Sequence, residues 1–416
     1  MSGDRHRRSR ANGEGSIYPY RNGSWAGYVW VTTPDGARKR DYVYGRSREE
    51  VHAKWLKLHS AARSGPVVTR SQTVGEYLAY WLAEVVIEPD YAPQTVAIYE
   101  SFSRLYIIPG LGNLRLDRLS VRHVRTWLAE LRSTCQCCAQ GKDAEREPEK
   151  RRCCAVGKCC ESRLSEYTVQ AILRAFRSAL SNGVREEMIP KNVASLVRVS
   201  KPRKSRKVKP WTVEEAQQFL ASARDADDSL YAAFVLILVL GLRRGEVLGL
   251  AWELVDLDQA ELFVGEQLQR VNHKILRRET KTEASEAPLP LPAICVAALK
   301  LRKNQQDTAR RAHSERWTDT GLVFTTRYGT PIEPRNFNRS FDYRIARAAV
   351  RRINVHGTRK TCGTLLAALD VHPRVAMQIL RHSRIAVTME IYTEATSKAT
   401  RDALKRLGDE LSPPGD

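Results

Sequence analysis

The segment VHGTRKTC, Val355–Cys362, places His356 and Arg359 three residues apart in a stretch with helical spacing. Side chains at this spacing lie on one face of a helix. An imidazole can exchange a proton near neutral pH, and a guanidinium can hold an anion in a planar fork of donors. The segment therefore raises the question of which reaction needs a proton acceptor beside an anion clamp.

Four further residues have side chains suited to the same chemistry. Arg243 lies in LGLRRGEVLGLAW, where a buried helix is expected to end at Gly241, and solvation alone explains an arginine there poorly. Lys281, in RRETKTEASEAPLPL, is expected at a hairpin turn, where its ammonium could reach a ligand. His382 and Tyr392 are ten residues apart in ILRHSRIAVTMEIYTE. Each alone is explained by packing or by a surface pair, so their order along the chain carries the information.

The overall charge indicates a polyanionic partner. Lys and Arg outnumber Asp and Glu by 68 to 47 in 416 residues, which gives a formal charge of +21. An excess of this size favours nucleic acid, with an anionic membrane surface as the alternative. The longest apolar run, residues 232–242, is too short to span a bilayer, and no apolar segment follows the basic N-terminus. We therefore expect a cytoplasmic protein.

The N-terminal part, residues 1–66, predicts a small β module. Residues 15–45 alternate aromatic or β-branched residues with polar ones, and RNGS and PDGA are typical of hairpin turns. The following SREEVHAKWLKLHSAAR has helical spacing and could pack on the sheet. The exposed face is expected to carry Arg21, Trp25, Arg38, Lys39 and Arg40. Such a face could enter a DNA groove or could simply be solvated.

The rest of the chain predicts two further domains joined by a basic linker. Residues 72–199 have mostly helical patterns, and a Cys-rich insertion at 135–160 separates the third helix from the fourth. Residues 200–210 form the linker, and residues 211–416 combine helices with a strand pair. The linker could be a solvated tether or could follow a phosphate backbone. Its basic residues are Lys201, Arg203, Lys204, Arg206, Lys207 and Lys209.

Seven of the nine cysteines lie in the insertion, so they form a local feature and not a framework of disulfides. Thiolates in a reducing compartment favour zinc, and four ligands drawn from both clusters could bind it. Only Cys135 and Cys138 have C-x-x-C spacing, and adjacent cysteines would point apart on a strand. The alternative is a loosely ordered basic loop with redox-sensitive thiols. The candidate zinc ligands are Cys135, Cys137, Cys138, Cys153, Cys154, Cys159 and Cys160.

In order along the chain, GLRRGE, TKTEAS, HGTRKT, LRHSRIAVT and MEIYTE resemble the signature of the phage-integrase type of tyrosine recombinase. That family has GLRxGE, KT, HxxR, LGH and a late tyrosine. The resemblance covers Trp211 to about Ala403 and, less specifically, the helical region before it. It implies a mainly α protein with small β elements: a three-stranded arm-binding module, a helical core-binding domain and a mixed α/β catalytic domain.

The resemblance implies a site-specific recombinase that cuts DNA by attack of Tyr392 and holds the strand as a 3′-phosphotyrosine, with no ATP, cofactor or metal needed for catalysis. The pKa of tyrosine is about 10, so the phenolate must form at the moment of attack. Preorganised cations would stabilise the charge on the phosphorus oxygens. The implied roles are phosphate binding by Arg243 and Arg359, hydrogen-bond donation by His382, proton acceptance by His356 and protonation of the leaving 5′ hydroxyl by Lys281.

Three positions depart from the family pattern without removing a catalytic group. Gly357 replaces the usual Asp, Lys360 stands where His is frequent, and Arg381 replaces the Gly of LGH. Glu246 matches the family's acidic position and is expected to orient its neighbours.

The resemblance also implies partners. These are double-stranded DNA attachment sites, a homotetramer on paired sites, a host DNA-bending factor and an excision factor, with no membrane and a nucleoid-associated location. The tail SKATRDALKRLGDEL, after Tyr392, would dock on a neighbouring subunit or pack on its own domain.

Three other functions compete with that of a recombinase. A type IB topoisomerase would use the same chemistry, but the β module and the tail argue against it. A DNA-binding regulator without catalysis would not need all six reactive residues. A membrane-surface protein would need a basic amphipathic helix, and the sequence has none outside the helical domains.

Overall fold

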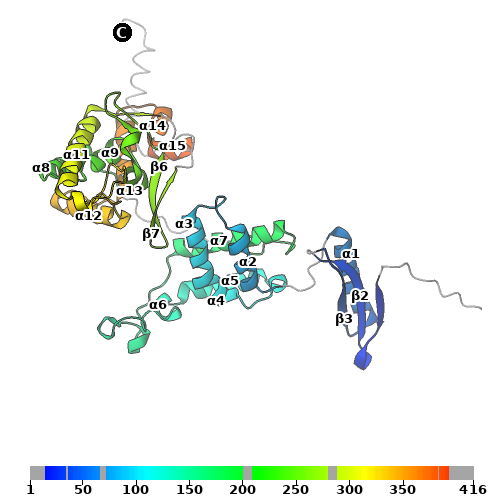
Figure 1. The fold of residues 1–416 in the computed structure, drawn as a ribbon. Helices are drawn as coiled ribbons and strands as arrows, with labels where there is room; N and C mark the ends of the chain where they lie inside the picture. Colours follow the sequence, from blue (N-terminus) through cyan, green and yellow to red (C-terminus); the bar gives the residue numbers. More distant parts are fainter. Residues whose placement is uncertain are drawn as a thin grey trace, which may run out of the picture. The chain divides into compact units, whose positions relative to one another are not determined.

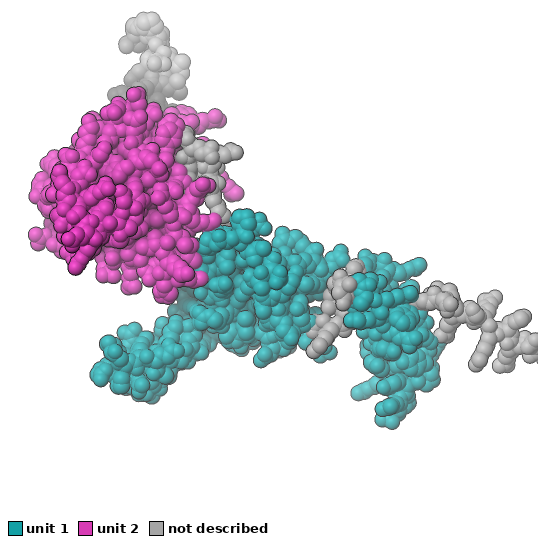
Figure 2. Space-filling model, viewed as in Figure 1, with its two compact units in different colours: residues 1–202 teal, residues 203–416 magenta. Residues whose placement is uncertain are grey.

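The computed structural model describes residues 15–33, 36–65, 72–199, 209–279, 288–382 and 384–392. The chain forms two compact units, Met1–Pro202 and Arg203–Asp416, which are coloured separately in Figure 2. The predicted fold class, mainly α with small β elements, is confirmed. In the described part of the chain, no helix is long and apolar enough to cross a bilayer.

The N-terminal module is a three-stranded antiparallel sheet covered on one face by a helix, as the alternating pattern predicts (Figure 1). Strands β1 (Ser16–Pro19), β2 (Trp25–Thr32) and β3 (Arg38–Gly45) pair in chain order, and α1 (Arg48–Ser64) follows. The side chain of Ser47 accepts the backbone N–H of Glu50 and so caps the start of α1.

The register of the sheet separates the basic residues of β3 onto two faces. Trp30 pairs with Arg40 and Val31 pairs with Lys39, and side chains alternate along a strand. Buried Val31 lies on the face that α1 covers, so Lys39 and Trp25 belong to that face by alternation, while Arg38 and Arg40 belong to the open one. The five residues expected on one exposed face therefore do not share a face, although Arg38, Lys39 and Arg40 are all exposed.

A helical body follows the β module. Its core is a cluster of buried apolar residues that includes Tyr77, Trp81 and Phe176. The hydroxyl of Tyr77 donates to the carbonyl of Ala179 at 2.5 Å and so joins the first and last helices of the body. The helices are α2 (Val74–Tyr80), α3 (Pro93–Phe102), α4 (Ile108–Leu111), α5 (Val121–Ser133), α6 (Gln136–Ala139) and α7 (Glu166–Arg185), with π-helical turns at Trp81–Val85 and Ser103–Ile107.

The Cys-rich insertion lies between α5 and α7, as predicted. Besides α6 it contains two 3₁₀ turns, Pro148–Lys150 and Cys154–Val156. Its own small core consists of Cys135, Cys137 and Cys153.

The second unit is built around α9 (Tyr231–Val239), which the apolar run 232–242 predicts as a buried helix. Every residue from 232 to 238 is buried, because other elements of the unit surround this helix. Its remaining helices are α8 (Val213–Asp225), α10 (Arg244–Gly249), α11 (Ala293–Ala312), α12 (Pro334–Arg347), α13 (Val355–Ala368), α14 (Pro373–Leu380) and α15 (Ile385–Tyr392).

Two small sheets complete the second unit. One has the order β4 (Val255–Asp256), β5 (Glu261–Leu262), β8 (Leu289–Pro290), and the other is the hairpin β6 (Glu266–Val271) and β7 (Lys274–Glu279). The hairpin turns at Asn272 and His273, which both have positive φ, of 46° and 66°. This hairpin is the predicted strand pair. Lys281 is two positions beyond β7 and lies outside the described residues.

Candidate active site

Helix α13 presents His356 and Arg359, as the sequence predicts. Asn354 caps the helix by accepting the backbone N–H of Gly357 at 2.8 Å, which fixes where the first turn begins. His356 is exposed in that turn, whereas Arg359, one turn further, is only 4% exposed. The two side chains therefore share one face of the helix, where His356 is open to solvent and Arg359 is buried.

The carbonyl of Gly241 holds one end of the Arg359 guanidinium, since Nη1 of Arg359 donates to it at 2.7 Å. Gly241 has a φ of +60°, and a Cβ there would lie 2.6 Å from Cδ2 of Leu380. The backbone can thus approach α13 only with glycine at this position. The other terminal nitrogen, Nη2 of Arg359, is buried and has no partner among the described residues.

Arg243 begins α10 and is fixed by Glu246. The backbone N–H of Arg243 donates to Oε2 of Glu246 at 2.8 Å, and Nη1 of Arg243 donates to Oε1 at 2.6 Å. Glu246 is buried, but the Arg243 side chain is 45% exposed. Glu246 therefore orients an arginine whose half-exposed side chain a ligand can still reach.

Arg381 is a residue whose position the sequence did not reveal. It ends α14 in the left-handed conformation, with φ 50° and ψ 52°, and its side chain is 2% exposed. Its Nη2 donates to Oε2 of Glu246 at 2.6 Å, and its carbonyl lies 3.4 Å from Nη2 of Arg243. The departure from LGH thus inserts a buried cation that shares the carboxylate of Glu246 with Arg243.

Burial and mutual repulsion shape the charges of this cluster. Burial, followed by the neighbouring Arg243, lowers the pKa of Arg359 to about 9. Burial alone would raise the pKa of Glu246, but Arg381, the backbone N–H of Arg243 and the Arg243 guanidinium more than offset it and hold this pKa below its usual value. The carboxylate therefore stays ionised while the cations around it repel one another.

Both histidines of the site are neutral at pH 7. Burial, then Arg359 and Arg243, lowers the pKa of His382 to about 4. The same causes in the same order lower the pKa of His356. Nδ1 of His382 lies 2.9 Å from Oγ1 of Thr388, a fully buried residue of α15, and this contact fixes the ring. Each neutral ring offers one proton donor and one proton acceptor.

Tyr392 is the last residue of α15, and its hydroxyl donates a hydrogen bond to the carbonyl of Val371. Burial raises the pKa of this phenol. The histidines and arginines act on one another electrostatically, whereas the hydroxyl of Tyr392 contacts the backbone after α13. The structure therefore brings Arg243, His356, Arg359 and His382 together and holds Tyr392 on Val371.

Several residues singled out in the sequence lie outside the described part of the chain. They are Lys281, the tail after Tyr392 and the linker residues Lys201, Arg203, Lys204, Arg206 and Lys207. Lys209, the last basic residue of the linker, is described and exposed.

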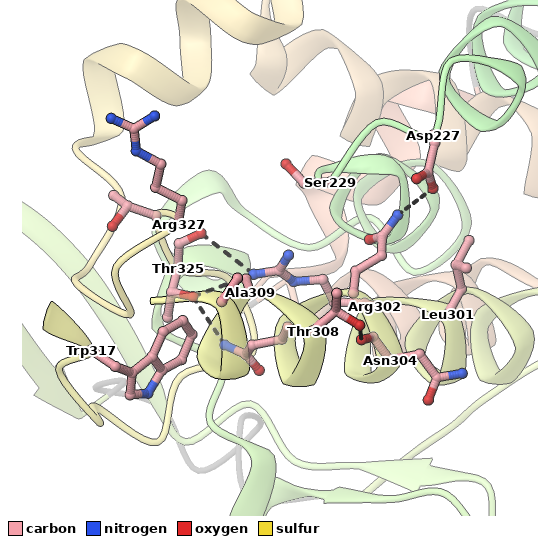
Figure 3. Close-up of a pocket in the computed structure, with 14 residues that line it drawn as sticks. Asp227, Ser229, Leu301, Arg302, Asn304, Thr308, Ala309, Trp317, Thr325 and Arg327 are labelled. Carbon is pink, nitrogen blue, oxygen red and sulfur yellow. Dashed lines mark hydrogen bonds between the residues drawn. The ribbon is translucent and has the colours of Figure 1, made fainter. Parts of the chain in front are cut away.

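A pocket of about 540 Å³ lies elsewhere in the second unit (Figure 3). Polar side chains that line it already form hydrogen bonds with other parts of the chain. Nε of Arg302 donates to the carbonyl of Val323 at 2.9 Å, and Nε2 of Gln305 donates to Asp227 at 2.6 Å. Burial lowers the pKa of Arg302 to about 10. None of the five reactive residues that the structure describes lines this pocket, and its hydrogen bonds tie α11 to the neighbouring loops.

The cysteines of the insertion converge. The Sγ atoms of Cys135, Cys138, Cys153 and Cys159 all lie within 4.8 Å of one another, a grouping that could hold a metal ion. The second cluster is a 3₁₀ turn followed by irregular chain, not a strand, and it contributes both Cys153 and Cys159 to this grouping. Cys154 belongs to neither of the two groups that the sulfurs form.

Comparisons with known proteins point to one family. Residues 210–399 match the phage integrase family, and residues 73–132 match the phage integrase N-terminal SAM-like domain. A XerC-like tyrosine recombinase of Caldanaerobacter subterraneus is 25% identical over 394 residues, which cover 90% of this chain and 93% of that relative. An integrase of Streptomyces ambofaciens is 26% identical over 378 residues, 87% of this chain and 88% of the relative.

Solved structures share the fold. The Tn1549 transposon integrase in complex with a circular intermediate DNA has a TM-score of 0.61 at 20% identity, and the match covers 81% of this chain and 100% of that one. A lambda integrase tetramer bound to a Holliday junction has a TM-score of 0.50 at 15% identity and covers 92% of this chain and 96% of that one.

Proposed function

This chain belongs to the phage-integrase family of tyrosine recombinases, and we propose that Tyr392 is the residue with which it cuts and rejoins DNA at attachment sites. The phenolic oxygen would attack a phosphodiester, form a 3′-phosphotyrosine and release a 5′ hydroxyl. The 5′ hydroxyl of another strand would then attack the phosphotyrosine and free Tyr392. One phosphate ester replaces another in each step, so no other energy source is needed.

The unpartnered Nη2 of Arg359 is the observation that carries this proposal. A buried guanidinium nitrogen without a partner is costly, because it has lost water and gained no acceptor. A phosphodiester oxygen would supply the acceptor, and the half-exposed fork of Arg243 would hold the second non-bridging oxygen. Removing one such donor typically lowers the rate about 10²- to 10³-fold.

The histidines are suited to the proton transfers. His356, which is neutral and exposed, would accept the proton of the Tyr392 phenol. The pKa of this phenol is raised, so a base is needed at the moment of attack. His382 would donate a hydrogen bond to the phosphate. Lys281, two residues beyond β7, would protonate the leaving 5′ oxygen. Tyr392 must leave the carbonyl of Val371 before it attacks.

We assign the first unit to DNA binding. The open face of the N-terminal sheet is basic and aromatic, since the guanidinium of Arg40 lies over the rings of Tyr28 and Trp30 at 4.9 and 4.8 Å, and Tyr42 and Tyr44 are 41% and 49% exposed. Residues 1–66 would bind arm-type sites, residues 72–199 the core site, and the basic linker 200–210 the phosphate backbone between the core-binding and catalytic domains. Binding should weaken steeply with salt.

The assembly proposed for the reaction is a homotetramer on paired attachment sites. A host DNA-bending factor and an excision factor would assist it, and the protein would work on the nucleoid in the cytoplasm. The lambda integrase tetramer on a Holliday junction supports the stoichiometry by analogy of fold.

A structural zinc in the insertion is the proposed metal, and it is not required for the chemistry. The four converging sulfurs of Cys135, Cys138, Cys153 and Cys159 match the ligand type and number of structural zinc sites.

The test of the catalytic assignment is a covalent adduct. Wild-type protein and Tyr392→Phe are incubated with nicked DNA carrying the attachment site, and protein attached to the 3′ phosphate is detected. Tyr343→Phe, a change at an exposed tyrosine of α12, is the matched control and should form the adduct. An adduct from Tyr392→Phe would refute the assignment. A two-site exchange assay then separates a recombinase from a topoisomerase.

A further inference from the structure

The six converging cysteines form two groups that share a sulfur. Beside the group of Cys135, Cys138, Cys153 and Cys159, the Sγ atoms of Cys137, Cys153 and Cys160 also lie within 4.8 Å of one another. Cys153 belongs to both groups and is fully buried. A single four-ligand site leaves Cys137 and Cys160 unexplained.

The sulfur separations are those of zinc tetrahedra. With Zn–S bonds of about 2.3 Å, neighbouring ligands of a tetrahedral ion lie about 3.8 Å apart. The Sγ atoms of Cys135 and Cys160 are 3.8 Å apart, those of Cys138 and Cys153 are 3.4 Å apart, and those of Cys138 and Cys159 are 4.0 Å apart. The first of these pairs connects the two groups, because Cys135 belongs to one group and its Sγ reaches Cys160 of the other.

We propose that the insertion holds a cluster of two zinc ions bridged by the thiolates of Cys135 and Cys153. Two tetrahedral ions need eight coordination bonds, and six thiolates supply eight only when two of them bridge. The bridging residues are the first cysteine of each cluster in the sequence. Cys138 and Cys159 complete one ion, and Cys137 and Cys160 complete the other. The proposal rests on the structural zinc proposed above and specifies its number and ligands.

The surrounding chain already holds the bridging residue in place. Asp143 is fully buried, and its carboxylate accepts the backbone N–H of Cys153 at 2.8 Å, that of Arg152 at 2.9 Å and that of Ala155 at 3.1 Å, together with Nη1 of Arg146 at 2.7 Å. The backbone N–H of Cys160 also donates to Sγ of Cys153 at 3.3 Å. Such outer contacts orient metal ligands.

The charge of the cluster is also compensated. Two Zn²⁺ ions and six thiolates leave a net charge of two negative units, after each thiol has released its proton. The insertion, residues 135–160, carries six basic and four acidic residues, so its own two positive units of charge match that excess. The basic residues are Lys142, Arg146, Lys150, Arg151, Arg152 and Lys158. A segment whose own core is three cysteines also gains through metal binding the stability that apolar burial does not provide.

The test is the metal content of the full-length protein, measured by mass spectrometry together with zinc X-ray absorption. We expect about two zinc ions per chain, an all-sulfur ligand shell and a metal–metal vector. Cys154→Ser is the matched control, because Cys154 is exposed and outside both groups, and it should keep about two ions. Cys137→Ser should lower the content to about one.

The outcomes separate the two metal proposals from each other and from the recombination chemistry. About one zinc per wild-type chain, unchanged in Cys137→Ser, would overturn the bridged cluster and keep the mononuclear site. If the protein contained no zinc and all seven thiols of the insertion reacted without a chelator, both the bridged cluster and the mononuclear site would be overturned. The adduct formed by Tyr392 is read in a separate assay, so neither result is confused with a failure of catalysis.

Discussion

Replacing Arg381 with glycine sets two effects of opposite sign against each other. Glycine is the residue usual in the family at this position, and it removes a left-handed conformation that costs an L-residue about 1 to 2 kcal/mol. However, Arg381 is the buried partner of Glu246 at 2.6 Å, and breaking a buried ion pair from one side costs about 3 to 5 kcal/mol. Glu246 keeps Arg243, so we expect a net loss of about 2 kcal/mol.

Thermal unfolding of the full-length chain, followed at the transition of the second unit, measures this balance. For a unit of this size, about 1 kcal/mol corresponds to roughly 2 to 4 °C, so Arg381→Gly should lower the Tm by about 4 to 8 °C. Ala349→Gly is the matched control, because Ala349 also has a positive φ, of 51°, and is exposed. It gives the same conformational relief without loss of an ion pair and should raise the Tm slightly.

The reasoning is refuted if Arg381→Gly raises the Tm as Ala349→Gly does, because Glu246 would then not depend on its buried partner. A double-mutant cycle with Glu246→Gln gives an independent reading. Residues in direct contact should show a coupling energy, whereas additive effects would mean that the two side chains do not interact.

Three more predictions concern the same site. The folded chain keeps His382 neutral down to about pH 4, whereas the same side chain takes up a proton near pH 6.5 in the unfolded chain, so the free energy of unfolding should fall as the pH drops between these values. The dependence of this free energy on pH should be flatter for His382→Asn, and an equal slope in both proteins would contradict the prediction. Gly241→Ala should lower the free energy of unfolding in denaturant by about 2 to 4 kcal/mol, because of the positive φ at this position and the contact of the new Cβ with Leu380. Gly321→Ala, at a position with a similar φ and open space around it, should lower it by about 1 kcal/mol, and equal losses would exclude the contact with Leu380. Inorganic phosphate should raise the Tm of the second unit by mass action, and should do so less in Arg359→Ala; an equal rise in both would place the anion elsewhere.

The sequence predicted the elements that depend on local pattern. Helix α13 follows from its helical spacing, and α9 from an uninterrupted apolar run. The β hairpins follow from alternation and turn residues. These signals are local because helix and strand periodicities and caps act over a few residues.

The remaining features depend on residues that are distant in the sequence. The burial of Arg381 is possible only because Glu246, 135 residues earlier, supplies a carboxylate, and no local signal reveals this pairing. The convergence of Cys137 with Cys160 depends on the 3₁₀ turn at Cys154–Val156 and the irregular chain after it, which no local pattern in the sequence indicates. The division of Arg38 and Lys39 between two faces is different, because it follows from the alternation of side chains along a strand, a local signal that the expectation of one basic face left out.

The charges of the site fit a ligand whose negative charge grows during the reaction. With both histidines neutral, Arg243, Arg359 and Arg381 contribute three positive charges and Glu246 one negative charge, so two positive charges remain uncompensated. Arg243 and Arg381 share the one carboxylate of Glu246, so the excess is spread over the three guanidinium groups. Burial first, and then repulsion by Arg243, lowers the pKa of Arg359. Folding fixes this repulsion before DNA arrives. In the proposed reaction a bound phosphodiester would relieve part of it. The transition state, which carries more charge on its non-bridging oxygens, would relieve more, so the site would stabilise the transition state beyond the substrate.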